Sequence, residues 1–137
     1  MQSIQRAFPS IFTDDIHAVR DFYIELFAWS VAFDSDWFVH LQAAESSPIG
    51  LGILRRGHEL VPAGRRGAPS GGMLTFVVDD VDALHALCVE RGFDIEEAPR
   101  DLFYGQRRML VRDPAGTLVD VSSECDPSPA FLESLKG

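Results

Sequence analysis

Histidines, cysteines and acidic side chains are the groups in this chain that could transfer protons or bind a metal. Two of the four histidines, His17 and His85, fall at polar positions of predicted helices and are expected to face solvent, while His58 falls in a connecting segment. His40 and Asp120 fall in predicted strands. Imidazole and carboxylate groups act as general acids and bases and as metal ligands, so these two are the candidates for either role.

The two cysteines show no spacing typical of a metal site. Cys88 lies in a helical pattern and is expected to be a small buried apolar residue. Cys125 lies near the C-terminus. The N-terminus resembles no signal peptide, which predicts a cytoplasmic protein, and a disulfide is not expected in that compartment.

Two paired aspartates belong to an internal repeat. The sequence IFTDDIHAV at residues 11–19 matches FVVDDVDAL at residues 76–84. In each copy an apolar extended run precedes Asp-Asp, and an apolar residue then begins a helical pattern. Aspartate at a helix start accepts hydrogen bonds from free N–H groups and favours the positive end of the helix dipole. Asp14-Asp15 and Asp79-Asp80 are therefore predicted to cap helices and not to form catalytic carboxylate pairs.

The pattern around each aspartate pair predicts a βαβββ module. Helices are predicted at residues 16–27 and 81–91 from the spacing of apolar residues and, for the second, from the stop signal of Gly92. Strands are predicted at residues 7–13, 30–34, 37–43 and 50–55, and again at 72–78, 94–98, 107–112 and 118–122, with a tight turn at 113–116. We therefore expect one α+β domain over residues 1–137, with half-modules at about 4–56 and 72–123, a linker at 57–71 and a tail at 124–137 that includes a short helix.

The linker is rich in glycine, proline and arginine, which predicts an exposed, mobile connection. Arg55, Arg56, Arg65 and Arg66 could contact an anion, or they could simply be solvated. The tail is a candidate for packing on a neighbouring subunit.

Composition excludes some partners. The chain has 137 residues and a net charge of −9, which argues against binding to nucleic acid or to an anionic membrane. No apolar run approaches the ~20 residues that a membrane span needs. The negative charge is compatible with a cationic ligand, or with solubility alone.

Three stretches carry a resemblance to a known superfamily. They are Asp21-Phe22-Tyr23, then Leu26-Phe27-Ala28-Trp29, and above all GQRRMLVRDPAGTLVDV at residues 105–121. With the paired βαβββ pattern, they resemble the vicinal oxygen chelate superfamily, which includes glyoxalase I, extradiol dioxygenases, fosfomycin-resistance enzymes and bleomycin-resistance binding proteins. The resemblance implies two sheets that curl into a cup-shaped mixed sheet, and a homodimer with ligand grooves shared between subunits. Ala28 replaces the usual glycine.

The resemblance also implies where metal-using members place their ligands. The corresponding positions here are Phe8 in the first strand, Met73 in the first strand of the second half, and Asp120 in the last strand. Phenylalanine offers no lone pair, methionine is a soft thioether, and one carboxylate does not make a catalytic metal site. We therefore expect no metal, no cofactor and no catalytic residue at these positions.

Two functions stay open at this point. The first is a non-catalytic protein that binds and sequesters an aromatic antibiotic or natural product, as bleomycin-resistance-like proteins do. The second is a glyoxalase- or dioxygenase-like enzyme with an atypical site in which His40 and Asp120 act. Strand alternation and loop position select the candidate ligand-binding residues. They are Phe8, Phe12, Phe33, Trp37, Phe38, His40, Met73, Phe103, Tyr104, Arg108 and Asp120. The aromatic residues among them could also be ordinary core. For Asp120, a buried carboxylate that hydrogen-bonds Arg108 or a serine is the alternative to contact with a cationic ligand.

Overall fold

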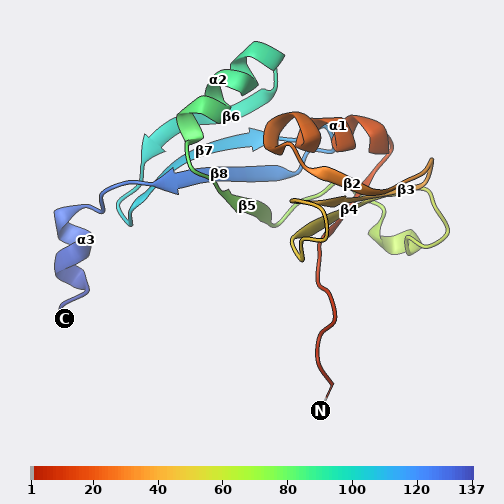
Figure 1. The fold of residues 1–137 in the computed structure, drawn as a ribbon, viewed down its shortest axis with the longest axis horizontal. Coiled ribbons are helices and arrows are strands. Elements are labelled where there is room, and N and C mark those ends of the chain that lie inside the picture. The colour runs from red at the N-terminus through yellow and green to blue at the C-terminus, as the bar shows by residue number, and fades with distance from the viewer. Residues whose placement is uncertain (1) are drawn as a thin grey trace. The chain divides into compact units, whose positions relative to one another are not determined.

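The structure is a computed structural model that describes residues 2–137. The described residues form three α-helices, one short 3-10 helix and two four-stranded sheets, whose path Figure 1 follows. In chain order the elements are β1 Ser10–Thr13, α1 Ile16–Phe27, β2 Ser30–Asp34, β3 Phe38–Gln42, β4 Gly50–Arg55, the 3-10 helix η1 Ala63–Arg65, β5 Met73–Val77, α2 Val81–Arg91, β6 Asp94–Asp101, β7 Gln106–Arg112, β8 Leu118–Glu124 and α3 Pro129–Ser134.

The two sheets have the same topology. The first has the strand order β1-β4-β3-β2 and the second β5-β8-β7-β6. In each, the leading strand runs parallel to the last strand of its module, and the other neighbours are antiparallel. This confirms the tandem βαβββ prediction and the α+β class.

The chain divides into two compact units. The first unit extends to Ser70 and includes Pro114–Thr117, while the second comprises Gly71–Asp113 and Leu118–Gly137. The boundary at Ser70 falls at the end of the predicted linker. A single domain over the whole chain stays a prediction.

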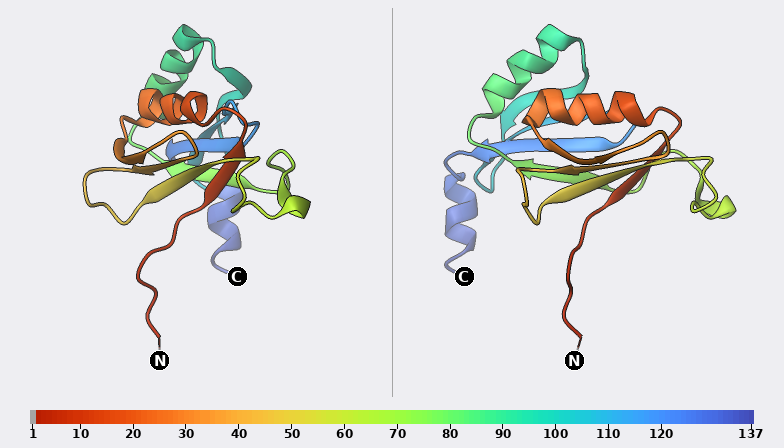
Figure 2. Two further views of the ribbon diagram at one scale, coloured as in Figure 1. Left: turned by 90° about the vertical axis from the view of Figure 1, so that its right-hand side faces the viewer. Right: turned by 45° about the vertical axis from the view of Figure 1, so that its right-hand side comes forward.

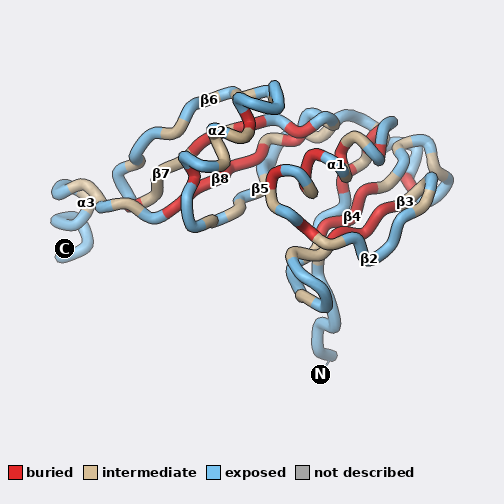
Figure 3. The backbone as a smooth tube through the Cα atoms, turned by 45° about the horizontal axis from the view of Figure 1, so that its top comes forward, coloured by how far each residue is buried: buried red, intermediate tan, exposed pale blue. Residues whose placement is uncertain are grey.

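The core of the first unit lies between α1 and its sheet. The apolar side chains of α1 repeat at helical spacing, and those of β3 and β4 alternate along the strands, so that both sets bury one face. Figure 3 shows burial concentrated along these elements. The fully or almost fully buried side chains are Ile16, Val19, Phe22, Tyr23 and Leu26 of α1 and Val39, Leu41, Leu51 and Ile53 of the strands.

The second unit repeats this layering with a less apolar helix. Only Val81 and Cys88 of α2 are buried, against Met109, Val111, Val119 and Val121 of β7 and β8. Burial raises the pKa of the Cys88 thiol to about 11. The prediction of a small, buried, apolar-like cysteine is confirmed.

Both predicted helix caps are present. Asp15 Oδ1 accepts from the Ala18 N–H at 3.1 Å, and Asp80 Oδ1 accepts from the Ala83 N–H at 3.2 Å. At the other ends, Ala28 and Gly92 both adopt the left-handed conformation, with φ of 54° and 70°. Alanine thus takes a backbone conformation that favours glycine, at a cost of about 1–2 kcal/mol.

Several predicted boundaries were wrong by a few residues. β1 begins at Ser10, so Phe8 lies in the extended segment before the strand instead of within it. β6 continues to Asp101 and β8 to Glu124, beyond the predicted ends.

The linker and the chain ends also differ in part from expectation. Val61 of the linker is only 1% exposed, and Arg66 donates to the carbonyl oxygens of Val61 and His58. The expected exposed connection therefore has a packed anchor. Figure 2 shows the N-terminal segment as an extended arm before β1 and the tail ending in α3. No helix within residues 2–137 is long and apolar enough to cross a membrane.

Candidate ligand site

Five ring-bearing side chains gather on the first sheet, on the face opposite α1. We call Phe8, Phe33, Trp37, Phe38 and His40 the aromatic face. Phe33 and His40 are cross-strand partners, and the alternating Val39 and Leu41 face the core. Ring centroids connect the set: 4.6 Å for Phe8–His40, 6.3 Å for Phe38–His40, 6.0 Å for Phe33–Phe38 and 5.7 Å for Trp37–Phe38.

His40 lies between Phe8 and Phe38 in the aromatic face. Its side chain is packed beside Gly50 and meets Phe8 edge to face, and the residue is 8% exposed. Burial, and secondarily the positive charge of Arg6, lowers the pKa of His40 from its ordinary value. The imidazole is therefore favoured in its neutral form, which offers one donor and one acceptor nitrogen.

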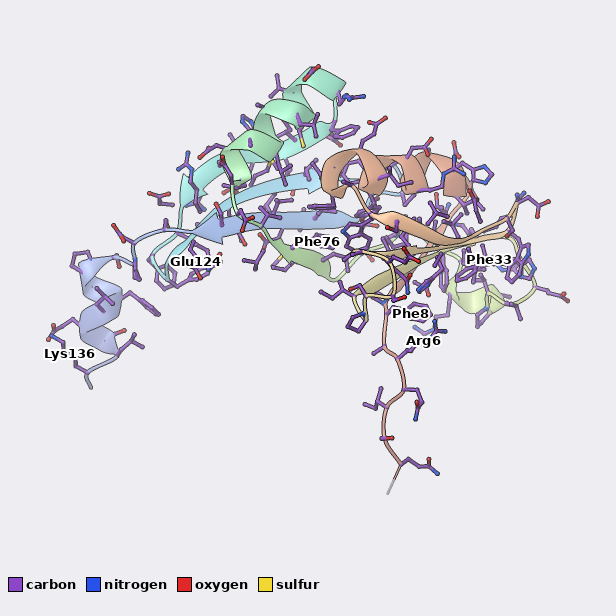
Figure 4. All side chains as sticks on the ribbon, in the orientation of Figure 1. Arg6, Phe8, Phe33, Phe76, Glu124 and Lys136 are labelled. Atoms are coloured by element: carbon purple, nitrogen blue, oxygen red, sulfur yellow. The ribbon has the colours of Figure 1, made fainter. Side chains whose placement is uncertain are left out.

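The segment before β1 contributes a cation to this face. The Arg6 guanidinium carbon lies 5.4 Å from the centroid of the Phe8 ring, within the range of a cation–π interaction. Figure 4 shows Arg6 and Phe8 where the extended arm meets the first sheet. The arm thus positions Phe8 although no strand contains it.

The linker covers one end of the aromatic face. His58 stacks on Trp37 with ring centroids 4.5 Å apart and planes 19° apart. Phe33, which like Trp37 contacts Phe38, is 49% exposed, and Trp37 and Phe38 are half-buried. These rings are thus neither closed core nor isolated surface residues. Phe12 is half-buried and no ring contact of the described residues joins it to them.

The second unit contains a polar group of residues on its own sheet. Asp120 is 4% exposed, and its Oδ2 accepts from Thr75 Oγ1 at 3.1 Å. Its Oδ1 has no hydrogen-bond partner among residues 2–137. Arg108 has its Nη2 3.8 Å from Glu97 Oε1. Asp120 is therefore a buried carboxylate, as one of the two alternatives had it, but its partner is the threonine on the paired strand and not Arg108 or a serine.

The remaining candidates lie elsewhere in the second unit. Met73 is 48% exposed on β5. Phe103 and Tyr104 lie in the loop before β7, where Phe103 packs against Phe131 of α3 with centroids 5.6 Å apart. The tail therefore packs on its own loop, and these two rings are not part of the polar group around Asp120.

Three arginines beside and within the linker have partners inside the first unit. Arg56 pairs with Asp14 at 2.9 Å and also donates to the Phe12 carbonyl. Arg55 donates to the Asp36 carbonyl. Together with the bonds of Arg66, these contacts account for three of the four arginines as structural residues.

The two helical histidines lie outside the aromatic face, and His17 has local partners. His17 Nε2 lies 3.0 Å from the Ser35 carbonyl oxygen and 3.6 Å from Asp34 Oδ1. His85 is half-buried on α2, and not fully solvent-facing as predicted.

Comparison with known proteins identifies the family. The model of the Glyoxalase/Bleomycin resistance protein/Dioxygenase superfamily matches residues 4–121. The chain belongs to this superfamily. The resemblance inferred from the sequence is thereby confirmed. A search of curated proteins finds no match.

Solved structures of the Glyoxalase/Bleomycin resistance protein/Dioxygenase superfamily share the fold. A family enzyme from Burkholderia phytofirmans PsJN is 25% identical, with a TM-score of 0.71 and coverage of 85% of this chain and 96% of that one. A lactoylglutathione lyase from Agrobacterium tumefaciens is 20% identical, with a TM-score of 0.65 and coverage of 89% and 96%. A family member from Sphaerobacter thermophilus is 19% identical, with a TM-score of 0.71 and coverage of 89% and 98%.

The residues at the superfamily's metal positions do not fit a divalent metal. Phe8 presents a hydrocarbon ring, Met73 a soft and half-exposed thioether, and Asp120 a carboxylate with one oxygen already bonded to Thr75. Within residues 2–137, no three or more histidine, cysteine or acidic side chains form a group that could hold a metal ion.

Sequence reasoning missed Arg6 and His58 as parts of these surfaces. Arg6 lies two residues before Phe8, a spacing that places both on one side of an extended segment, so this signal was available. His58 gave no such signal, because its stacking on Trp37 depends on the path of the linker. Strand alternation placed Thr75 on the inward face of its strand, but it did not identify Thr75 as the hydrogen-bond partner of Asp120.

Proposed function

We propose that this protein binds a planar aromatic small molecule noncovalently on the aromatic face of its first unit, and so sequesters it. The observation that carries the proposal is the chain of ring contacts from Phe8 through His40 and Phe38 to Trp37 and Phe33, left partly exposed at Phe33 and Trp37. Apolar surfaces with a few polar groups are typical of small-molecule sites, and aromatic pairs contribute about 0.5–1.5 kcal/mol beyond area burial.

The polar groups on this face would orient the ligand. The neutral His40 imidazole offers a donor and an acceptor, and Arg6 adds a positive charge beside Phe8. Ring faces would supply most of the binding free energy, while His40 would select ligands with a matching polar substituent. The superfamily description includes bleomycin-resistance proteins, and this is the only support that the family comparison gives to the proposal.

An enzyme is less well supported. His40 belongs to the first unit and Asp120 to the second. Among the described residues, neither side chain forms a hydrogen bond with another titratable side chain that would activate it for proton transfer. The enzymatic alternative stays a prediction without an observation in its favour.

A thermal-shift screen tests the proposal. Bleomycin, an anthracycline and an acridine dye are the probes, and a ligand at 100 times its Kd should stabilise the fold by about 2.7 kcal/mol. Phe38→Leu should reduce the shift, whereas Phe131→Leu, an aromatic substitution in α3, should leave it unchanged. Recovery of the probe chemically altered, or no shift with any probe, would overturn the proposal.

Two further expectations accompany this function. A homodimer and a cytoplasmic location stay predictions, the first from the superfamily resemblance and the second from the N-terminal sequence. Analytical ultracentrifugation with and without a stabilising probe tests the first.

A further inference from the structure

A buried acceptor on the second sheet lacks a donor. Asp120 is 4% exposed, and although Thr75 Oγ1 donates to its Oδ2 at 3.1 Å, its Oδ1 has no partner within the described chain. A buried polar atom without a hydrogen bond costs free energy, and buried carboxylates are normally paired. Asp120 Oδ1 is therefore oriented for a donor that residues 2–137 do not supply.

Two hydroxyl side chains share the face of Asp120. Thr75 pairs with Asp120 across β5 and β8, and Ser122 follows two residues along β8, so strand alternation puts all three on one face. The Thr75 hydroxyl donates its hydrogen bond to Asp120 Oδ2, and its oxygen lone pairs can still accept hydrogen bonds. This face therefore presents a carboxylate oxygen beside two hydroxyl oxygens.

A donor without a partner lies close by. Arg108 of β7 is the cross-strand partner of Ser122, which makes it a diagonal neighbour of Asp120 on the same face. Its Nε is buried and has no hydrogen-bond partner within the described chain, while its Nη2 lies 3.8 Å from Glu97 Oε1. The same Glu97 oxygen pairs with Arg100 Nε at 2.5 Å, so one carboxylate faces two guanidinium groups, and neither contact uses the Nε–H of Arg108.

We propose that this face of the second unit binds a primary ammonium group in a molecule that also carries a hydroxyl or carbonyl oxygen a few bonds away. The ammonium would donate its three protons to Asp120 Oδ1, Thr75 Oγ1 and the Ser122 hydroxyl, and the oxygen would accept from Arg108 Nε. Amino amides, amino alcohols and amino sugars are of this class. The proposal does not depend on the aromatic face of the first unit.

Charge and access favour this ligand class. The second unit has thirteen acidic and six basic residues, so its field attracts a cation and opposes a carboxylate. Thr75 is exposed, and Met73 and Val77 on the same side of β5 are 48% and 66% exposed. Solvent therefore reaches the β5 edge of this face, at Thr75, whereas Asp120 Oδ1 and Arg108 Nε themselves are buried.

An NMR titration tests the proposal with glycinamide as the probe. Glycinamide has an ammonium group and a carbonyl oxygen, ethylamine has only the first, and acetamide lacks the ammonium. We expect saturable shifts of the Thr75 and Asp120 amides and of the Arg108 Nε–H resonance with glycinamide, weaker binding of ethylamine, and none of acetamide.

Substitutions test whether Asp120 and Arg108 bind a ligand or only pair with each other. Asp120→Asn keeps an oxygen for Thr75 and should fold, which the amide spectrum checks, and it should weaken glycinamide about tenfold or more because a charge-assisted bond is lost. Arg108→Lys should weaken glycinamide but not ethylamine. Arg112→Lys on the same strand and Trp37→Phe in the first unit should change neither.

Two outcomes would overturn the proposal. The first is the absence of saturable shifts with glycinamide, or binding that Asp120→Asn leaves intact. The second is a stability coupling between Asp120→Asn and Arg108→Lys in a double-mutant cycle, which would show that the two side chains pair with each other in solution. Because Trp37→Phe reports on the aromatic face alone, failure of this proposal is distinguishable from failure of the aromatic one.

Discussion

The indole of Trp37 lies nearly parallel to the imidazole of His58, with ring centroids 4.5 Å apart and 19° between the planes. The Leu60 N–H donates to His58 Nδ1 at 3.1 Å, which fixes the ring from the linker side. One face of Trp37 is thus covered by a residue of the linker, and the indole also contacts Phe38 in a tilted arrangement.

Removing that imidazole should expose Trp37. In a Trp29→Phe background, where Trp37 is the only tryptophan, His58→Ala should increase quenching of Trp37 emission by acrylamide. It should also lower the free energy of unfolding by about 0.5–1.5 kcal/mol, the contribution of an aromatic pair. His85→Ala, which removes a histidine from α2, serves as the control. Unchanged acrylamide quenching would show that the stack does not persist in solution.

The lowered pKa of His40 predicts a loss of stability in acid. Burial and Arg6 depress the pKa in the folded state, so the unfolded chain binds a proton more readily. The contribution of neutral His40 is fully present above its unfolded pKa of about 6.5 and is lost as the pH falls through the folded value. Urea unfolding at pH 7 and at pH 5 measures this loss.

His40→Gln is the matched variant for that measurement. Glutamine does not titrate, so the stability of this variant should fall less between pH 7 and pH 5 than that of the unmodified protein. Carboxylate effects are common to both proteins and cancel in the comparison. Equal pH dependence of the two would contradict the assignment.

The rings of Phe8 and Phe38 occupy space that a side chain at Gly52 would fill. A Cβ at this position would come within 3.2 Å of one carbon in each ring and 2.7 Å of Ser10 Oγ. The serine can rotate away, but both rings would have to shift. Gly52→Ala should therefore lower the unfolding free energy by about 1–3 kcal/mol, as overpacking does, and weaken binding of aromatic probes.

The control for this substitution is Gly57→Ala in the linker. A Cβ there meets no atom within 4 Å, so stability and probe binding should both stay close to those of the unmodified protein. Chemical denaturation and the thermal-shift assay measure both quantities. A Gly52→Ala protein as stable as Gly57→Ala would rule out close packing of the rings around Gly52.

The sequence predicted the modules because each carries strong local signals. Asp15 and Asp80 cap their helices as expected, and the alternation of Val39 and Leu41 with His40 placed the aromatic side of β3. The start of β1 was missed since Phe8 sits in an extended segment whose ladder partners begin only at Ser10.

The contacts of the site were harder to predict. The stacking of His58 on Trp37 depends on a linker path that Val61 and Arg66 fix through packing and carbonyl bonds. Strand alternation placed Asp120 and Thr75 on one face, but only the register of β5 with β8 makes them opposite residues. Periodicity identifies faces, whereas partners depend on register and loop geometry.

Ala28 offers a test of the left-handed helix end. Its φ of 54° matches the role of Gly92, whose φ is 70°. Ala28→Gly should relieve the strain, partly offset by the greater entropy of the unfolded chain, for a net gain of up to about 1 kcal/mol. The reverse change, Gly92→Ala, should destabilise. Thermal unfolding of both variants checks the prediction, and a loss of stability in Ala28→Gly would contradict it.

The most direct test of aromatic-ligand binding is a fluorescence titration of Trp29→Phe protein, in which Trp37 alone emits. Trp29 is 9% exposed and contacts Tyr23 and Phe27 of α1. In Trp37→Phe protein only Trp29 emits, so its fluorescence reports on the α1 side of the first sheet. Adding bleomycin, an anthracycline or an acridine dye should quench Trp37 saturably with at least one probe, and leave Trp29 emission unchanged in the Trp37→Phe protein. Absence of saturable quenching with all three probes, or equal quenching of Trp29, would contradict binding on the aromatic face.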